Sequence, residues 1–293
     1  MYRILIPVDF SEGSYKTCLY ALQLANGVPD AKLLLLHCFQ DYLADADPTP
    51  ASAASLSPTE QVTERVLHRN ELEAQQQLDD LYQDLLHRTR KAGQTLHIER
   101  AFIHGLPEEE ILEQIERFRP ALVLMSTKGE SSIGRTVFGT VSTKVVQETH
   151  VPVLTVPSQY TGNTITKVLY AANFGTTDAS DIDQIRKLLQ HLQPMIYCVH
   201  ISDDPEEDRE KLLALQQTLQ TGTLGSDIRY ALLEGSDVAQ ALQDFARGEG
   251  IDMLALTTRE RTSLESLFKP SLAKKMVLHA QLPVLVFHGK LQE

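Results

Sequence analysis

The sequence predicts an α/β protein built from two tandem, doubly wound parallel five-stranded sheets of the Rossmann-like type. Three observations support this prediction: the length of 293 residues, a repeat of the chain upon itself, and an alternation of short apolar runs with helical patterns in each copy. A chain of this length holds about two domains, each large enough to bury its own core. Strands that alternate with helices in this way form a parallel sheet covered on both faces.

The repeat is the strongest of the three observations. Residues 4–11 (ILIPVDFS) resemble residues 168–175 (VLYAANFG), and from residue 122 onward the two copies align without a gap at an offset of 131 residues. Self-similarity of this kind indicates two copies of one structural unit. The predicted units are a first domain at residues 1–160, a linker at Thr161–Thr164 and a second domain at residues 165–293.

The first copy carries about 33 additional residues between His37 and Gly105. They comprise a Pro/Ala/Ser-rich stretch, Asp45–Pro58, followed by a long helical pattern over Gln61–Arg90. The small, polar and proline-rich stretch cannot bury enough apolar area to order itself. We therefore expect it to form a loop or lid near the ligand side of the first sheet.

Near-continuous apolar runs predict the strands, as expected when helices cover both faces of a parallel sheet. In the first copy these runs are Arg3–Val8, Lys32–Cys38, His97–Phe102, Ala121–Ser126 and Val151–Val156. Between them, apolar residues recur with helical spacing. The periodic sets are Tyr15, Cys18, Leu19 and Leu22, then Ile111, Ile115 and Phe118, then Ile182, Ile185, Leu189 and Leu192, then Val238, Ala241, Leu242 and Phe245. Pro107 and the triplet Glu108–Glu110 suit a solvent-exposed helix start.

Composition and charge exclude several classes of protein. The chain has 27 Lys and Arg against 39 Asp and Glu, a net charge of −12, so it lacks the basic footprint that nucleic acids select. No apolar run approaches the roughly 20 residues of a membrane span. No apolar signal region follows Met1, and the three cysteines are odd in number and far apart, which favours a reducing cytoplasm. The histidines form no ligand-pair motif, so no protein-held metal site is expected.

The candidate ligand site lies at the carboxyl ends of the strands, where open α/β sheets bind ligands. Three segments of the first copy converge there: Pro7–Asp9 after the first strand, Cys38 and Phe39 after the second, and Met125–Ser142 after the fourth. The third segment contains two glycines, Gly129 and Gly139, followed by hydroxyl residues at a helix start. Glycines permit close backbone approach, and a helix start with free N–H groups forms an anion site.

Both copies resemble universal stress protein domains, whose nucleotide-binding members carry Gly-x2-Gly-x9-Gly-(Ser/Thr) after the fourth strand. The first copy reads Ser126-x2-Gly129-x9-Gly139-Thr140, with serine in place of the first glycine. Asp9 and His37 also match the family pattern. The resemblance implies an adenosine pocket lined by Pro7, Val8, Asp9 and Cys38. It further implies that ribose and phosphates are held by Met125, Ser126, Gly129, Gly139, Thr140, Val141 and Ser142.

The resemblance implies a cytoplasmic protein with a regulatory or sensing role in stress, which binds ATP, AMP or ADP, with Mg²⁺ accompanying the nucleotide, in its first domain. No general base is identifiable, so no catalytic residue is predicted and at most slow ATP hydrolysis is expected. In the second copy Glu260, Pro270 and Asn173 replace Gly129, Gly139 and Asp9. A carboxylate beside phosphates is repulsive and proline lacks a backbone donor, so the second domain is predicted to have lost nucleotide binding.

Other readings of these residues stay open at this point. Asp9 could cap the first helix, Gly139 could serve only as a helix-start glycine, and His37 could be a packed strand-end histidine. Residues 129–136 resemble a P-loop, but arginine stands where the lysine is required. Two rival functions follow: a ligand-free interaction module in which both sites have decayed, and an ATP-consuming enzyme of the adenine-nucleotide alpha-hydrolase group. The second rival requires a Ser-Gly-Gly-type loop that residues 7–11 lack.

The fifth strands predict how the copies assemble. Val151–Val156 and Leu282–Phe287 are apolar and have proline at their second position, which suits the start of an edge strand. An open apolar edge invites pairing, and the resemblance implies dimerisation through this strand. We therefore predict an intramolecular pseudo-two-fold pair through Val153–Val156 and Val284–Phe287. A homodimer of the full chain could still use another surface, such as the helix over Gln61–Arg90.

Overall fold

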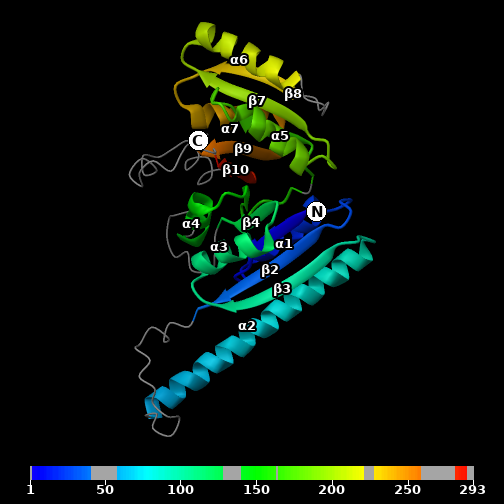
Figure 1. The fold of residues 1–293 in the computed structure, drawn as a ribbon, viewed down its shortest axis with the longest axis vertical. Coiled ribbons are helices and arrows are strands. Elements are labelled where there is room, and N and C mark those ends of the chain that lie inside the picture. Colours follow the sequence, from blue (N-terminus) through cyan, green and yellow to red (C-terminus); the bar gives the residue numbers. More distant parts are fainter. Residues whose placement is uncertain are drawn as a thin grey trace.

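The computed structural model describes residues 2–40, 58–127, 140–162, 164–220, 228–258 and 281–288. Its strands form a single ten-stranded sheet (Figure 1). The first half contributes β1 (Arg3–Pro7), β2 (Lys32–Phe39), β3 (His97–His104), β4 (Leu122–Ser126) and β5 (Val153–Val156). The second half contributes β6 (Lys167–Ala171), β7 (Met195–Ser202), β8 (Ile228–Glu234), β9 (Met253–Thr258) and β10 (Val284–His288).

The strand order repeats in mirror fashion about the centre of the sheet. It runs β3-β2-β1-β4-β5-β10-β9-β6-β7-β8, so each half shows the order expected of a doubly wound domain. Every strand pairing is parallel except that of β5 with β10. The predicted α/β fold is therefore confirmed, with the two five-stranded halves joined edge to edge.

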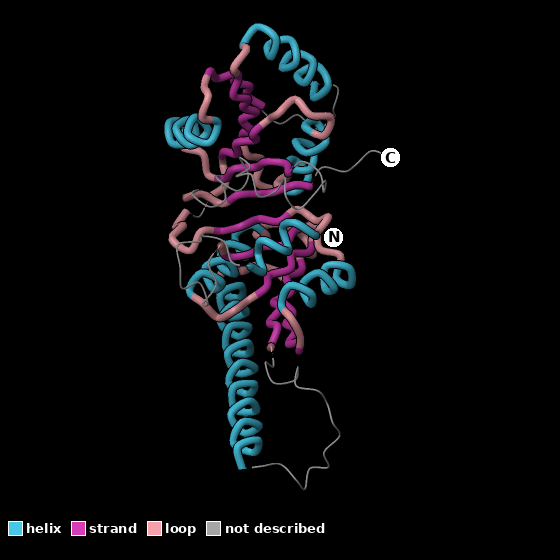
Figure 2. The backbone as a smooth tube through the Cα atoms, turned by 90° about the vertical axis from the view of Figure 1, so that its left-hand side faces the viewer, coloured by secondary structure: helices cyan, strands magenta, loops and turns pink. Residues whose placement is uncertain are grey.

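Helices cover both faces of this sheet (Figure 2). One face is covered by α1 (Glu12–Leu24), α2 (Pro58–Lys91), α5 (Asp178–Leu188) and α6 (Pro205–Gln220). The other is covered by α3 (Pro107–Phe118), α4 (Thr140–Glu148) and α7 (Val238–Glu249). Apolar residues on alternate strand positions fill the space beneath each layer. The parallel strands are accordingly apolar on both sides, as their sequences predicted.

The insertion in the first copy forms α2, whose 34 residues exceed the 16 of its counterpart α6. A helix of this length spans about 50 Å. Its carboxyl-terminal part packs against the sheet through Leu78 and Leu85, which are buried, while its amino-terminal part projects well beyond the sheet (Figures 1 and 2). The predicted loop over Asp45–Pro58 lies outside the described residues, apart from Pro58, which begins α2.

Most predicted strands match the observed ones within two residues, and the differences have local causes. β5 begins at Val153 rather than Val151 because Pro152 has no N–H for the ladder. The Pro152 carbonyl instead accepts a hydrogen bond from the Val123 N–H at 3.0 Å. The helix predicted through Leu192 ends earlier, at Leu188. Among the described residues, no helix has the length and apolar character needed to cross a membrane.

The two halves meet through the antiparallel ladder predicted from their fifth strands. Val153, Leu154 and Thr155 pair with Val286, Leu285 and Val284 respectively. All six residues are at most 1% exposed, and the Thr155 hydroxyl donates to the Val284 carbonyl at 3.3 Å. One hydrophobic cluster runs without a break across this seam, including Leu154 and Leu285. The predicted intramolecular pairing is therefore present in the structure.

A fragment of residues 1–160 should form a dimer in solution. Separation from the second half exposes β5, whose apolar side chains each lose about 1.5–3 kcal/mol of burial free energy, and self-pairing of β5 restores that burial. Light scattering gives the mass of the fragment directly. A matched fragment carrying Leu154→Lys should be monomeric, because the lysine places a charge in the seam. A monomeric unmodified fragment would refute the proposed role of this edge.

Candidate functional site

The candidate site of the first half is the sheet edge formed by the carboxyl ends of β1, β2 and β4. Strand alternation places three predicted site residues on the face covered by α3 and α4. Met125 and Cys38 belong to the apolar cluster beneath these helices, and Pro7 follows Leu5 of the same cluster by two positions. Thus Pro7, Cys38 and Met125 face one layer although they come from three strands. Gly129 and Gly139 lie outside the described residues.

The end of β4 and the start of α4 lie in contact. The Ser142 hydroxyl in the first turn of α4 donates to the Ser126 carbonyl at 3.4 Å, and Ser142 is only 7% exposed. Thr140 begins α4, and Val141 packs on the cluster that contains Met125. The predicted phosphate-binding residues that the structure describes are therefore brought together at one corner of the sheet, beside a helix amino terminus, which attracts anions.

The loop after β1 is shaped by its own side chains. The Asp9 Oδ1 accepts hydrogen bonds from the Ser11 N–H at 3.1 Å and the Ser11 hydroxyl at 2.6 Å, and Ser11 in turn caps α1 by accepting from the Ser14 N–H. Between them Phe10 has a φ of +61°. Such a backbone is strained for a residue with a side chain and persists only where the surroundings hold it. Asp9 therefore stabilises the turn that precedes α1, whereas the helix cap that the sequence offered for Asp9 is supplied by Ser11.

A stacked aromatic pair holds Phe10 in place. Its ring lies 4.3 Å from that of His37, whose Nδ1 donates to the Val8 carbonyl at 2.9 Å. Burial lowers the pKa of His37, which favours the neutral ring. The second half has a similar arrangement: Phe174 has a φ of +56°, and its ring centroid lies 4.1 Å from that of His200, with the two rings tilted by 36°. Because the pair occurs in the half that lacks the glycine motif, it stabilises the loop rather than serving ligand chemistry.

The equivalent edge of the second half contains a buried polar cluster, the Tyr170 cluster, formed by Tyr170, Asp178, Asp181 and Thr257. The Tyr170 hydroxyl lies 2.8 Å from Asp178 Oδ1, 3.2 Å from Asp181 Oδ2 and 3.1 Å from the Thr257 hydroxyl. Thr257 donates to Asp181 at 2.6 Å. Tyr170 and Asp178 are fully buried and Asp181 is 2% exposed. Two carboxyl groups are thus enclosed together without an ion-pair partner among the described residues.

Enclosure changes the chemistry of both carboxyl groups. Burial raises the pKa of Asp178 and that of Asp181, since a low-dielectric surrounding disfavours the charged form. The hydroxyl donors of Tyr170 and Thr257 oppose this effect only in part. If Asp181 is protonated on Oδ2, this group can donate a hydrogen bond to the Tyr170 oxygen, which lies 3.2 Å away. The cluster can therefore accommodate a neutral carboxyl group.

The alignment of the two copies contained a signal for this cluster that the residue patterns did not reveal. At the offset of 164, Tyr170, Asp178 and Asp181 stand where the first copy has Ile6, Ser14 and Thr17. Asp178 and Asp181 also precede Ile182 and Ile185 on the inward stripe of α5. Acidic residues at buried positions of an apolar helical stripe are the sequence signal for this cluster, and the spacing of apolar residues alone does not reveal it.

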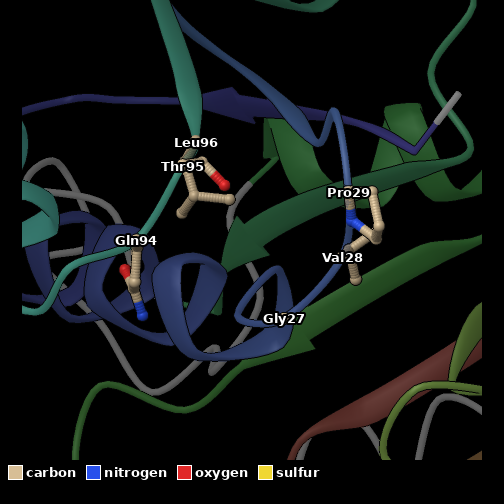
Figure 3. A pocket seen from close by; sticks show the side chains of 6 residues that line it. All are labelled: Gly27, Val28, Pro29, Gln94, Thr95 and Leu96. Carbon is tan, nitrogen blue, oxygen red and sulfur yellow. The ribbon is translucent and has the colours of Figure 1, made fainter.

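A hollow among the described residues lies at the opposite edge of the sheet, at the amino ends of the strands. It measures about 180 Å³ and sits between the loops that precede β2 and β3 (Figure 3). Its lining residues are Gly27, Val28, Pro29, Gln94, Thr95 and Leu96. None of them is charged, and the position at the amino ends of the strands differs from that of ligand sites in open α/β sheets. The candidate site therefore remains at the carboxyl edge.

Asp181→Asn should stabilise the chain at neutral pH by about 1 kcal/mol. The raised pKa means that the folded carboxyl holds a proton at pH values where the unfolded one has lost it, so the wild type becomes less stable as pH rises through the folded pKa. The variant removes that cost, and its advantage should vanish near about pH 4, the ordinary pKa of aspartate. Urea unfolding between these pH values measures the difference.

Asp244→Asn is the matched control, because Asp244 is an exposed carboxylate of the same half. It should leave the free energy of unfolding unchanged within about 0.5 kcal/mol. A loss of stability in Asp181→Asn that is equal at every pH would contradict the argument, since it would mean that the change disrupts the hydrogen bonds of the cluster and that no proton-linked cost exists in the wild type.

Comparison with known proteins agrees with this architecture. A universal stress protein of Methanocaldococcus jannaschii is 27% identical over 154 residues, covering 53% of this chain and 81% of the relative. The crystal structure of a universal stress protein from Archaeoglobus fulgidus superposes with a TM-score of 0.71 at 18% identity, covering 98% of both chains. A functionally unknown protein from Pseudomonas aeruginosa PAO1 gives 0.60 at 16% identity, covering 98% of this chain and 92% of that one. At these identities the two structures show the fold alone.

Relatives with bound nucleotides are also matched: a universal stress protein in complex with cAMP, and one from Arabidopsis thaliana with AMP bound. Their TM-scores of 0.39 and 0.34 carry no argument about the site of this chain. The model of the universal stress protein family matches residues 1–157 and again residues 166–288. Because these two spans include nearly the whole chain, the protein belongs to the universal stress protein family, with two copies of the family domain in tandem.

Proposed function

We propose that the first half binds an adenine nucleotide, ATP with Mg²⁺ or else AMP or ADP, and that the second half serves as a scaffold without a nucleotide. Pro7, Val8, Asp9 and Cys38 would border the adenosine, while Met125, Ser126, Gly129 and Gly139 to Ser142 would hold ribose and phosphates. The role is regulatory or sensing, in the response to stress. Family membership and the convergence of the described members of this set at one sheet edge support the proposal.

The observation that carries the proposal is the contact between the end of β4 and the start of α4 in the first half. The Ser142 hydroxyl donates to the Ser126 carbonyl at 3.4 Å, so the described ribose and phosphate residues lie beside a helix amino terminus, where anions bind. In the second half the sequence has Glu260 and Pro270 at the positions of Gly129 and Gly139, and a carboxylate there would repel a phosphate. The first half is thus compatible with a polyphosphate and the second is not.

A ligand-free interaction module is the second candidate. Asp9 favours it, because its Oδ1 is engaged by Ser11 within its own loop. In this candidate the residues at the edge of the first half stabilise the turn into α1 and nothing else. The two candidates differ in one measurable quantity, the binding of nucleotide to the purified chain.

Titration calorimetry with ATP and Mg²⁺ should give a stoichiometry near one per chain. Gly129→Glu, which copies the residue of the second half, should abolish binding without unfolding the chain, because a carboxylate then stands beside the phosphates. Gly248→Glu is the matched control: it introduces the same charge in α7, where a side chain meets open space. A stoichiometry near two would contradict the asymmetry, and an absence of binding would favour the interaction module.

A further inference from the structure

Glu110, in the first turn of α3, turns its side chain inward whereas its neighbour Glu109 is exposed. The side chain of Glu110 lies over the α-carbon of Gly105. A Cβ built on Gly105 would lie 2.7 Å from the Glu110 Cγ and would also clash with its carboxylate. Gly105 has a φ of +148°, a backbone conformation that favours glycine. The absence of a side chain at position 105 therefore makes room for the Glu110 carboxylate.

This carboxylate lies at the end of β2, beside a predicted site residue. The charge of Glu110, together with burial as the larger cause, raises the pKa of the Cys38 thiol to about 12. The Gly105 N–H donates to the Phe39 carbonyl at 3.1 Å, which ties the start of α3 to the end of β2. Within the described part of the chain, no hydrogen bond or ion pair satisfies the Glu110 carboxylate. Among the residues that the structure describes, it is a partly buried acceptor without a partner.

The second half provides an internal comparison. The helices α3 and α7 begin and end at an offset of 131 residues, so Glu110 corresponds to Ala241 in α7. The Ala241 side chain also turns inward: its Cβ would lie 3.7 Å from a Cβ built on Gly235. The inward position at this helix start therefore holds a methyl group in the half predicted to lack nucleotide. In the first half the same position holds a carboxylate.

We propose that Glu110 is the residue that reads the base of the nucleotide, accepting a hydrogen bond from an exocyclic amino group and so selecting adenine over 6-oxopurines. The inference rests on the proposed function. In the order β2-β1-β4 the phosphates lie at the β4 end, beside α4, so the base extends toward β2 and reaches Cys38. An ionised carboxylate only accepts hydrogen bonds. Adenine offers an amino donor there, whereas guanine and hypoxanthine offer an oxygen that the carboxylate repels.

Calorimetry with ATP and with inosine triphosphate (ITP), which carries a 6-oxo group, tests the inference on the full chain. The wild type should bind ATP about tenfold to hundredfold more tightly than ITP, the range of a hydrogen bond to a charged group. In Glu110→Gln the ratio should fall to about threefold or less, because an amide donates to the 6-oxo group as well as it accepts. Glu109→Gln makes the same change on the exposed side and should keep the wild-type ratio.

Alkylation of Cys38 provides a readout independent of nucleotide. Removal of the Glu110 charge lowers the pKa of the Cys38 thiol, so Glu110→Gln should label faster than the wild type at the same pH, while Glu109→Gln should not. Cys18 and Cys198 are fully buried, and mass spectrometry of the labelled peptides separates the sites.

The outcomes separate this inference from the proposed function. A wild type that binds ATP, with an unchanged ATP to ITP ratio in Glu110→Gln, overturns the role of Glu110 alone. An unchanged labelling rate of Cys38 also overturns it, since the carboxylate then does not lie beside the thiol. A wild type that binds neither nucleotide contradicts the proposed function and this inference together.

Discussion

Three residues of β5 and three of β10 form the antiparallel ladder that joins two five-stranded sheets into one. A parallel sheet needs helices on both faces and some cover for its last strand, because an open apolar edge pairs with whatever chain it meets. In this protein each half covers the other. The apolar cluster that contains Leu154 and Leu285 therefore continues from one half to the next, beneath α1, α2, α5 and α6. The tandem arrangement provides, within one chain, the pairing of fifth strands that an isolated domain could make only with a second chain.

The same ladder separates the two ligand edges. Because β5 and β10 run in opposite directions, the carboxyl ends of the first-half strands and those of the second-half strands point to opposite edges of the sheet. A substitution at the carboxyl ends of the strands in one half therefore does not contact the equivalent edge of the other half. The two copies could therefore diverge at their edges while retaining the loop that turns each first strand into its helix, with Phe10 on His37 and Phe174 on His200.

Acidic residues at the two edges illustrate how position decides the role of a charge. Asp178 and Asp181 face the layer of α5, beneath the end of the strands, where burial raises their pKa and no cation among the described residues compensates them. Glu110 lies on the opposite face of the sheet, beside Cys38. It is partly buried there, whereas Asp178 and Asp181 are enclosed. The first arrangement is a closed polar cluster in the interior of the second half, where a carboxyl group is favoured in its neutral form. The second leaves a hydrogen-bond acceptor facing the end of β2 in the first half, where we propose that the base binds.

The sequence by itself determined the duplication, the α/β class, the strands to within two residues, and the pairing of the fifth strands, because each depends on local apolar patterns and on the position of proline. Only the tertiary structure decided which acidic residues turn inward. Glu110 belongs to a triplet that reads as a solvent-exposed helix start, yet a glycine five residues earlier lets its side chain fold back toward Cys38. In the sequence, Tyr170 has only the pattern of a strand residue. In the structure, Asp178 and Asp181 of α5 and Thr257 of β9 surround its hydroxyl. Each of these contacts joins side chains of different elements, so the apolar periodicity of one element does not reveal it. The partners of such a side chain are decided only when the elements pack.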